Sequence, residues 1–146
     1  MTTSIERSRT APLLEDAIGT DAAALLLRLA LGVMFIAHGA TKVLVWGLPG
    51  TAAFFASIGL PGWLAWPITA LELIGGVLLI AGIGVRWLAL ILAIELFAAS
   101  VPHWSHGWMF SAPGGGWEYP IFMAVSALAL ALLGGGRYCL KRTRTP

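Results

Sequence analysis

The sequence predicts an all-α integral membrane protein, a four-helix bundle whose N and C termini are both cytoplasmic. The chain is 58% apolar and only 11% charged, which leaves too little polar surface for a soluble domain of 146 residues. Four apolar segments each approach the ~20 residues needed to cross hydrocarbon. Most basic residues fall in the N-terminal tail, the second loop and the C-terminal tail, so the positive-inside rule places both termini in the cytoplasm.

One transmembrane domain is expected over residues 21–140. Its spans are expected at about residues 22–46, 63–83, 86–102 and 117–135. Residues 1–20 lack a useful apolar period and are predicted to form a disordered or surface-lying cytoplasmic tail, without a cleaved signal peptide. Residues 141–146 form a basic cytoplasmic tail, which we interpret as a topology signal and not as a nucleic-acid site.

The connections between spans carry signals of their own. A short interfacial helix is expected at about residues 51–59, with Thr51 as its N-cap and the Gly59-Leu60-Pro61 run ending it. The glycine-rich second connection is tight, so the second and third spans are expected to be antiparallel neighbours. All seven tryptophans lie at or near predicted segment ends, where indole rings suit the headgroup layer. The single cysteine, Cys139, excludes an internal disulfide.

Helical phase places the polar residues of each span on one face. On the first span, a stripe at helical spacing comprises Arg28, Gly32, Phe35, Gly39 and Lys42, with His38 at its border. On the second span, Glu72 shares a face with Gly75 and Gly76, and such small residues let helices approach closely. On the third span, Glu95 shares its side with Ile91, Ala98, Ala99 and Pro102. We expect these faces to converge inside the bundle.

Glu72 and Glu95 lie near the middle of apolar spans, where an acid needs a partner or a water-filled cavity. The outer half of the bundle also offers an imidazole, an amine and an aromatic rim, which suit a carbonyl-bearing amphipathic ligand such as a quinone. The imidazole could donate to a quinone oxygen, and a carboxyl could exchange the accompanying proton. The candidate ligand-binding residues are His38, Lys42, Glu72, Glu95, Glu118 and Trp117.

Other interpretations of the same residues stay open. The two acids could simply hydrogen-bond neighbouring helices and fix their packing. The packing candidates are Arg28, Gly32, Gly39, Gly75 and Gly76. His103 and His106, with Glu118, form a weak metal-site pattern at the outer surface. Bound haem is not expected, because only one histidine lies clearly inside the bilayer.

Several short motifs in this order resemble the DoxX family, over about residues 25–140. They are Arg28 to Gly32 followed by His38-Gly39 and Lys42, Phe54-Phe55 with Gly59-Leu60-Pro61, Glu72 to Gly76, Gly116 to Pro120, and Gly136-Arg137-Tyr138. The resemblance implies a small four-helix protein of the bacterial inner membrane. Some DoxX proteins are membrane subunits of sulfur-compound:quinone oxidoreductases or associate with redox-defence enzymes. The family pattern highlights Arg28, His38, Gly39, Lys42, Glu72, Gly75, Gly76, Trp117 and Glu118, but Cys139 stands where a serine is more usual.

The leading hypothesis is a multi-pass inner-membrane subunit of a quinone-linked oxidoreductase, which binds a quinone or similar lipophilic ligand in the outer half of the bundle. The resemblance assigns no catalytic residue. Its expected partners are the lipid bilayer, redox-enzyme subunits and further copies of itself, with no nucleic acid. A non-enzymatic scaffold or assembly subunit is the alternative. A small transporter or proton path is weaker, because four spans without an evident repeat are few for transport.

Overall fold

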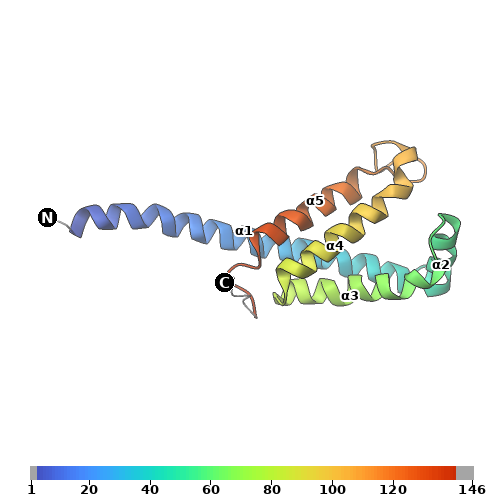
Figure 1. Cartoon of the computed structure of the whole chain (residues 1–146), viewed down its shortest axis with the longest axis horizontal. Helices are drawn as coiled ribbons and strands as arrows, with labels where there is room; N and C mark the ends of the chain where they lie inside the picture. Colours follow the sequence, from blue (N-terminus) through green and yellow to red (C-terminus); the bar gives the residue numbers. More distant parts are fainter. Residues whose placement is uncertain (1–2, 141–146) are drawn as a thin grey trace.

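The structure, a computed structural model, describes the backbone of residues 3–140 and the side chains of residues 18–140. Within these residues the chain is helical and contains no β-strand (Figure 1). The elements are α1 (Thr3–Leu44), α2 (Gly47–Ser57), the 3-10 helix η1 (Gly62–Leu64), α3 (Ala65–Ala81), α4 (Val85–Ser100), the 3-10 helix η2 (Val101–His106) and α5 (Glu118–Leu133). The predicted all-α class is therefore confirmed, while the basic tail at residues 141–146 lies outside the described residues.

Three helical segments are long and apolar enough to cross a membrane. They are Ile18–Leu44, Gly62–Ala81 and Val85–His106, of 27, 20 and 22 residues. The fourth apolar helix, α5, has 16 residues, so it rises only about 24 Å, less than the roughly 30 Å of a hydrocarbon core. The chain is thus a multi-pass membrane protein with three full-length candidate spans and a shorter α5 packed mainly on α4.

The N-terminal region is helical and not an irregular tail. Helix α1 runs without a break for 42 residues, and its first part projects well beyond the other helices (Figure 1). Residues 3–20, which the sequence suggested as a disordered or surface-lying tail, belong to this helix in the structure. The physical reason is that the apolar part of α1 already supplies the costly helix nucleus, and residues 3–20 contain enough Glu, Arg, Leu and Ala to extend it.

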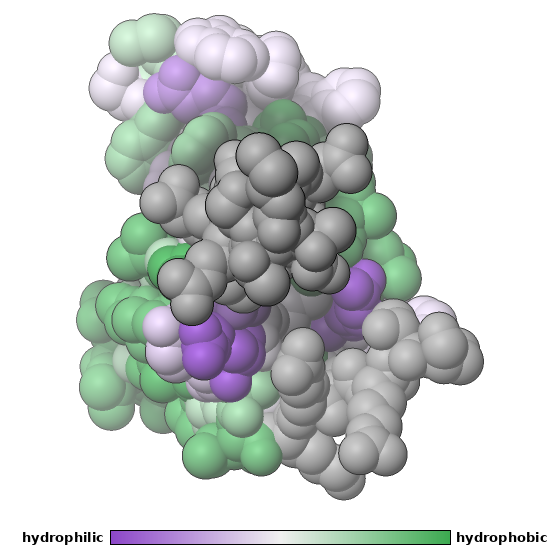
Figure 2. All heavy atoms as spheres, turned by 90° about the vertical axis from the view of Figure 1, so that its left-hand side faces the viewer, coloured by the Kyte–Doolittle hydropathy of each residue, from purple (hydrophilic) through white to green (hydrophobic). Residues whose placement is uncertain are grey.

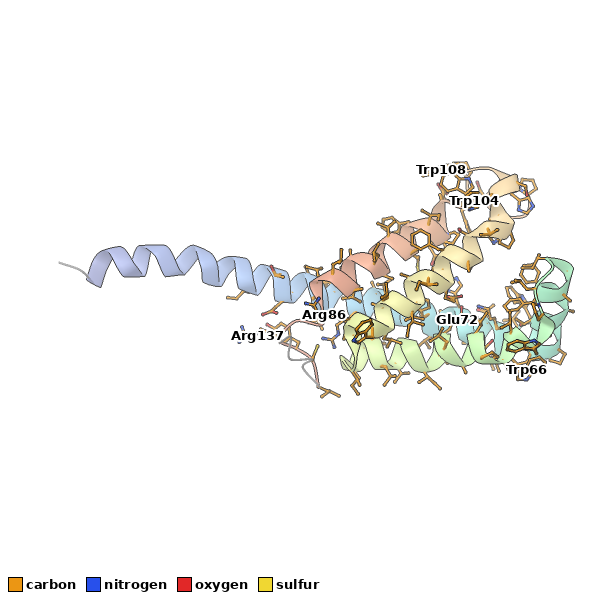
Figure 3. The ribbon with its side chains drawn as sticks, viewed as in Figure 1. Trp66, Glu72, Arg86, Trp104, Trp108 and Arg137 are labelled. Atoms are coloured by element: carbon orange, nitrogen blue, oxygen red, sulfur yellow. The ribbon has the colours of Figure 1, made fainter. Side chains whose placement is uncertain are left out.

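The helices form two tight pairs, α1 with α3 and α4 with α5, and the two pairs contact each other less extensively. The pairs meet at the end where α3 turns into α4 and diverge toward α2 and η2 (Figure 1). Trp66, Trp104 and Trp108 lie at the diverging end, whereas Arg86 and Arg137 lie at the opposite end (Figure 3). We call these the aromatic end and the terminal end.

Helices α1 and α3 touch through glycine. A Cβ atom added to Gly76 would lie 2.6 Å from the Gly32 carbonyl oxygen, and one added to Gly32 would lie 2.8 Å from the Gly76 oxygen. No side chain fits between the two backbones there. The rest of the predicted α1 stripe is also turned inward, since Arg28 and Phe35 are each only 1% exposed. The inward phase derived from the sequence therefore matches the packing.

The predicted face of α4 is only partly correct. Ile91 is 49% exposed, and Ala98 and Ala99 are exposed too, so the side that they share with Glu95 does not face the core. The buried face of α4 instead carries Val85, Ala89, Leu92, Ala93, Leu96 and Ser100. Alanine and leucine form this face because α4 packs mainly along α5, which leaves Glu95 half-buried at its border.

Helix α2 begins at Gly47, four residues before the expected cap at Thr51. Gly47 adopts a positive φ of 69°, which favours glycine and separates α2 from α1. Pro49 follows in the first turn of α2, where its missing N–H removes no intrahelical bond. Thr51 is consequently buried inside the helix, and its hydroxyl donates to the Gly47 carbonyl oxygen at 3.1 Å.

The terminal end is closed by arginines that cap helix C-termini. The buried Arg28 guanidinium donates to the α3 carbonyl oxygens of Leu79 (2.9 Å) and Ile80 (2.7 Å). It also donates to the carbonyl oxygens of Gly135 (2.9 Å) and Tyr138 (3.1 Å), which belong to the segment after α5. These bonds pair carbonyl oxygens at the C-terminus of α3 and in the segment after α5, although the Leu79 oxygen also accepts from the Gly82 backbone N–H at 3.1 Å.

Arg86 caps the C-terminus of α5 in the same way. Its guanidinium donates to the carbonyl oxygens of Leu132 (3.0 Å) and Ala131 (3.4 Å). Figure 2, viewed from the side of the terminal end, shows hydrophilic patches next to hydrophobic surface. The basic residues at this end therefore complement helix dipoles as well as marking it by their charge.

Candidate functional site

A cluster of polar side chains lies in the half of the bundle nearer the aromatic end. Its members come from all four long helices, and we call it the polar cluster: His38 and Lys42 from α1, Glu72 from α3, Glu95 from α4 and Tyr119 from α5. Glu72 and Glu95 fall near the midpoints of their candidate spans, Gly62–Ala81 and Val85–His106. In a bilayer these two acids would therefore lie where lipid provides no hydrogen-bonding partners.

Lys42 and Glu72 form a buried ion pair. The Lys42 Nζ atom lies 2.5 Å from Glu72 Oε1 and 2.6 Å from Oε2, and the two side chains are only 13% and 5% exposed. Gly39 brings the two helices together here, because a Cβ atom on it would meet Leu73 Cγ at 2.8 Å. In a low-dielectric interior each charge offsets part of the desolvation cost of the other. Removing either side chain would leave its partner as an uncompensated buried charge.

Glu95 completes the charged part of the cluster. Its carboxyl lies within electrostatic range of both Glu72 and Lys42. Its Oε2 atom is buried and has no hydrogen-bond partner among the described residues. Two carboxyls and one ammonium group thus interact electrostatically, an arrangement that can hold or release a proton without an unbalanced charge on both acids.

His38 and Tyr119 form the aromatic part. Their rings stack, with centroids 6.0 Å apart and an interplanar angle of 21°. The Nδ1 atom of His38 lies 2.8 Å from the Met34 carbonyl oxygen. A carbonyl only accepts, so Nδ1 carries the proton and Nε2 of the neutral ring is an acceptor. The expected donation from His38 to a quinone oxygen stays a prediction.

Three buried side-chain oxygens in the described residues have no hydrogen-bond partner: Thr69 Oγ1, Glu95 Oε2 and the Tyr119 hydroxyl. Thr69 lies one turn from Glu72 on the buried side of α3. An unsatisfied buried polar group costs about 1–3 kcal/mol, so each such atom calls for water or a ligand. Thr69 and Tyr119 were not predicted as site residues, because neither ring stacking nor a missing partner is visible in a sequence.

Trp117 and Glu118 lie at the start of α5, next to Tyr119, and contact the loop that precedes this helix. The Glu118 Oε1 atom accepts a hydrogen bond from the Phe110 backbone N–H at 2.8 Å. Trp117 packs edge-to-face on Trp108, with centroids 4.6 Å apart. These contacts hold the η2–α5 connection in shape. Phe110 in turn contacts the Tyr119 ring at 5.7 Å, so the loop borders the polar cluster.

The two histidines proposed as a weak metal pair also belong to this connection. The rings of His103 and His106 are 6.1 Å apart, and His103 Nδ1 lies 3.1 Å from the Gly114 carbonyl oxygen. Glu118 is engaged with Phe110. Across the described residues, no group of three or more His, Cys, Asp or Glu side chains is placed to hold a metal ion. The geometry gives the metal interpretation no support.

Comparisons with known proteins identify the family of this chain. Residues 23–107, which contain most of the polar cluster, match the DoxX family. A relative from Bacillus subtilis (strain 168), named "Putative oxidoreductase CatD", is 38% identical over 111 residues, which cover 75% of this chain and 78% of that protein. No solved structure matches the chain significantly. The family match covers more than half of the chain and confirms the resemblance drawn from its motifs, so this protein belongs to the DoxX family.

Proposed function

We propose that this protein is a membrane subunit of a quinone-linked oxidoreductase system in the cytoplasmic membrane of a bacterium, and that it binds a quinone at the polar cluster. The observation that carries the proposal is the buried Lys42–Glu72 ion pair with Glu95 beside it. Quinone reduction and oxidation move protons with electrons, and a carboxyl pair at mid-membrane is suited to exchange them. The name of the Bacillus relative points to the same class of reaction.

The proposed arrangement has four membrane helices, with the terminal end facing the cytoplasm. Arg86 and Arg137 support this orientation, because basic residues favour the cytoplasmic side. Helix α5 is the shortest of the four membrane-crossing segments, and local thinning of the bilayer accommodates its length. The polar cluster then lies in the outer half of the membrane, with subunits of a redox enzyme or further copies of this chain as partners.

The test begins with the protein purified in mild detergent. We expect lipid extraction and mass spectrometry to detect a co-purifying quinone. His38→Ala and Glu72→Gln should each lower the quinone-dependent activity of membranes at least tenfold, because each removes a group of the cluster. His106→Ala is the matched control, since this exposed histidine lies at the aromatic end. The proposal would be refuted if no quinone co-purified with the protein and both variants kept the full quinone-dependent activity.

A non-enzymatic scaffold is the second candidate. It is favoured by one observation: Lys42 and Glu72 satisfy each other within the bundle and so can act as an internal clasp. Such a clasp would hold α1 against α3 without any ligand. Polar contacts of this kind are common between membrane helices.

A double variant separates the two candidates. Lys42→Met alone should destabilise the protein by about 3–5 kcal/mol, because it leaves Glu72 as an uncompensated buried charge. Adding Glu72→Met removes that charge and should restore most of the thermal stability in detergent. Under the quinone proposal the stable double variant has lost its quinone-dependent activity. A stable double variant with full activity would favour the scaffold.

A further inference from the structure

The Tyr119 side chain is held firmly but its hydroxyl is unused. The ring stacks on His38 at 6.0 Å and contacts Phe110 at 5.7 Å, so it is fixed from two sides. The hydroxyl oxygen is buried and has no hydrogen-bond partner among the described residues. A buried tyrosine hydroxyl normally finds a partner. A fixed ring with a free hydroxyl is what a binding site provides for a ligand atom.

The neighbouring imidazole offers the complementary function. When the imidazole of His38 is neutral and its Nδ1 donates to the Met34 carbonyl oxygen, its Nε2 is an acceptor. His38 is exposed within the chain, so a ligand can reach it. A hydroxyl that donates and an imidazole nitrogen that accepts therefore lie on stacked rings. Glu95 Oε2, the other unpartnered oxygen of the polar cluster, comes from the helix that pairs with α5.

These two groups match one oxygen of a quinone in both of its redox states. A quinone carbonyl oxygen only accepts, and the Tyr119 O–H can donate to it. The hydroxyl of the corresponding hydroquinone donates, and Nε2 of His38 can accept from it. Neither interaction requires a charged ligand, which suits a site inside a bilayer.

We infer that Tyr119 is a ligand-binding residue, and that Tyr119 and His38 together hold one ring oxygen of a quinone or hydroquinone between α5 and α1. The inference rests on the proposed function. It adds a residue from the helix that lies outside the family match, and it assigns donor and acceptor roles.

The experiment measures equilibrium binding of a short-chain benzoquinone, and of its hydroquinone, to the full-length protein in lipid nanodiscs. Tyr119→Phe keeps the ring and removes only the hydroxyl. We expect the quinone affinity to fall about tenfold, as for the loss of one buried hydrogen bond. The thermal unfolding midpoint should be unchanged or higher, because the lost hydroxyl has no partner within the chain. Tyr138→Phe, at the exposed ring near the terminal end, is the matched control.

The outcomes are distinguishable. If the unmodified protein binds neither form, the proposed function fails and this inference fails with it. If it binds both and Tyr119→Phe binds them equally well, only the inference is overturned. A variant that loses stability while keeping its affinity would show that Tyr119 is a packing residue. A selective loss of affinity at full stability would support the inference.

Discussion

At the scale of single residues, Arg28 stands out because its guanidinium bonds to elements that lie far apart in the described chain. It joins α1 to the end of α3 and to the segment that follows α5, through donors fixed in one plane. We expect Arg28→Met to destabilise the protein by roughly 3 kcal/mol or more, because several buried carbonyl groups lose their donor at once. Thermal unfolding in detergent measures the loss.

Two control variants test whether the capping bonds of Arg28 are responsible. Arg28→Lys keeps the charge but lacks the planar fork, so it should recover only a minor part of the stability. Arg137→Ala removes a basic side chain that is exposed at the same end, and it should change the unfolding midpoint little. Equal midpoints for all three variants would contradict the capping role of Arg28.

Some residues of the polar cluster can be recognised in the sequence and others cannot. The acids, Lys42 and His38 could be singled out because a polar residue in an apolar span is conspicuous. Tyr119 was missed as a site residue because tyrosine is ordinary near a membrane interface, and its significance lies in an unpartnered hydroxyl. The pairing of Lys42 with Glu72 could not be derived either, since phase gives a direction and no distance.

At the scale of elements, two adjacent glycines of α3 have different roles. A Cβ atom on Gly76 would lie 2.6 Å from the Gly32 carbonyl oxygen, which is rigid backbone. A Cβ atom on Gly75 would lie 3.4 Å from the nearest atoms of Leu88 and Leu92, which is ordinary contact. Gly76→Ala should therefore force α1 and α3 apart, whereas Gly75→Ala should be neutral or stabilising by about 0.5–1 kcal/mol.

The measurement is again thermal unfolding, read together with the yield of folded protein from membranes. The two variants differ by one position and carry the same added methyl group, so general effects of alanine cancel. A Gly75→Ala variant as damaged as Gly76→Ala would show that the α1–α3 contact is not the critical one.

Element boundaries were predictable where apolar periodicity or turn residues dictate them. The α3–α4 turn is an example, because Gly82 and Gly84 both adopt positive φ and mark it in the sequence. The start of α1 was not predictable, since helix propagation from the membrane span decides it. The inward side of α4 is not predictable from Glu95, because the residues that share its side are exposed and the alanine and leucine face packs in the core instead.

At the scale of the whole molecule, the proposed orientation makes a direct prediction. In a Cys139→Ser background, which keeps an acceptor near Arg28, single cysteines can be placed at Ser105 and Arg137, one at each end of the bundle. We expect a membrane-impermeant maleimide to label Ser105→Cys from the outside of intact cells. It should label Arg137→Cys only in inverted vesicles. The reverse pattern would overturn the orientation.

The hydrogen bonds from Arg28 to residues near the C-terminus also constrain the order in which the helices assemble. Its acceptors on Gly135 and Tyr138 are 107 and 110 positions further along the chain. During synthesis the first span is therefore made with a cationic side chain whose partners do not yet exist. Once α3 is made, the carbonyl oxygens of Leu79 and Ile80 are available to this arginine, but its remaining N–H groups must stay hydrated until the segment after α5 arrives. The bundle can close at the terminal end only as one of the last events of its assembly.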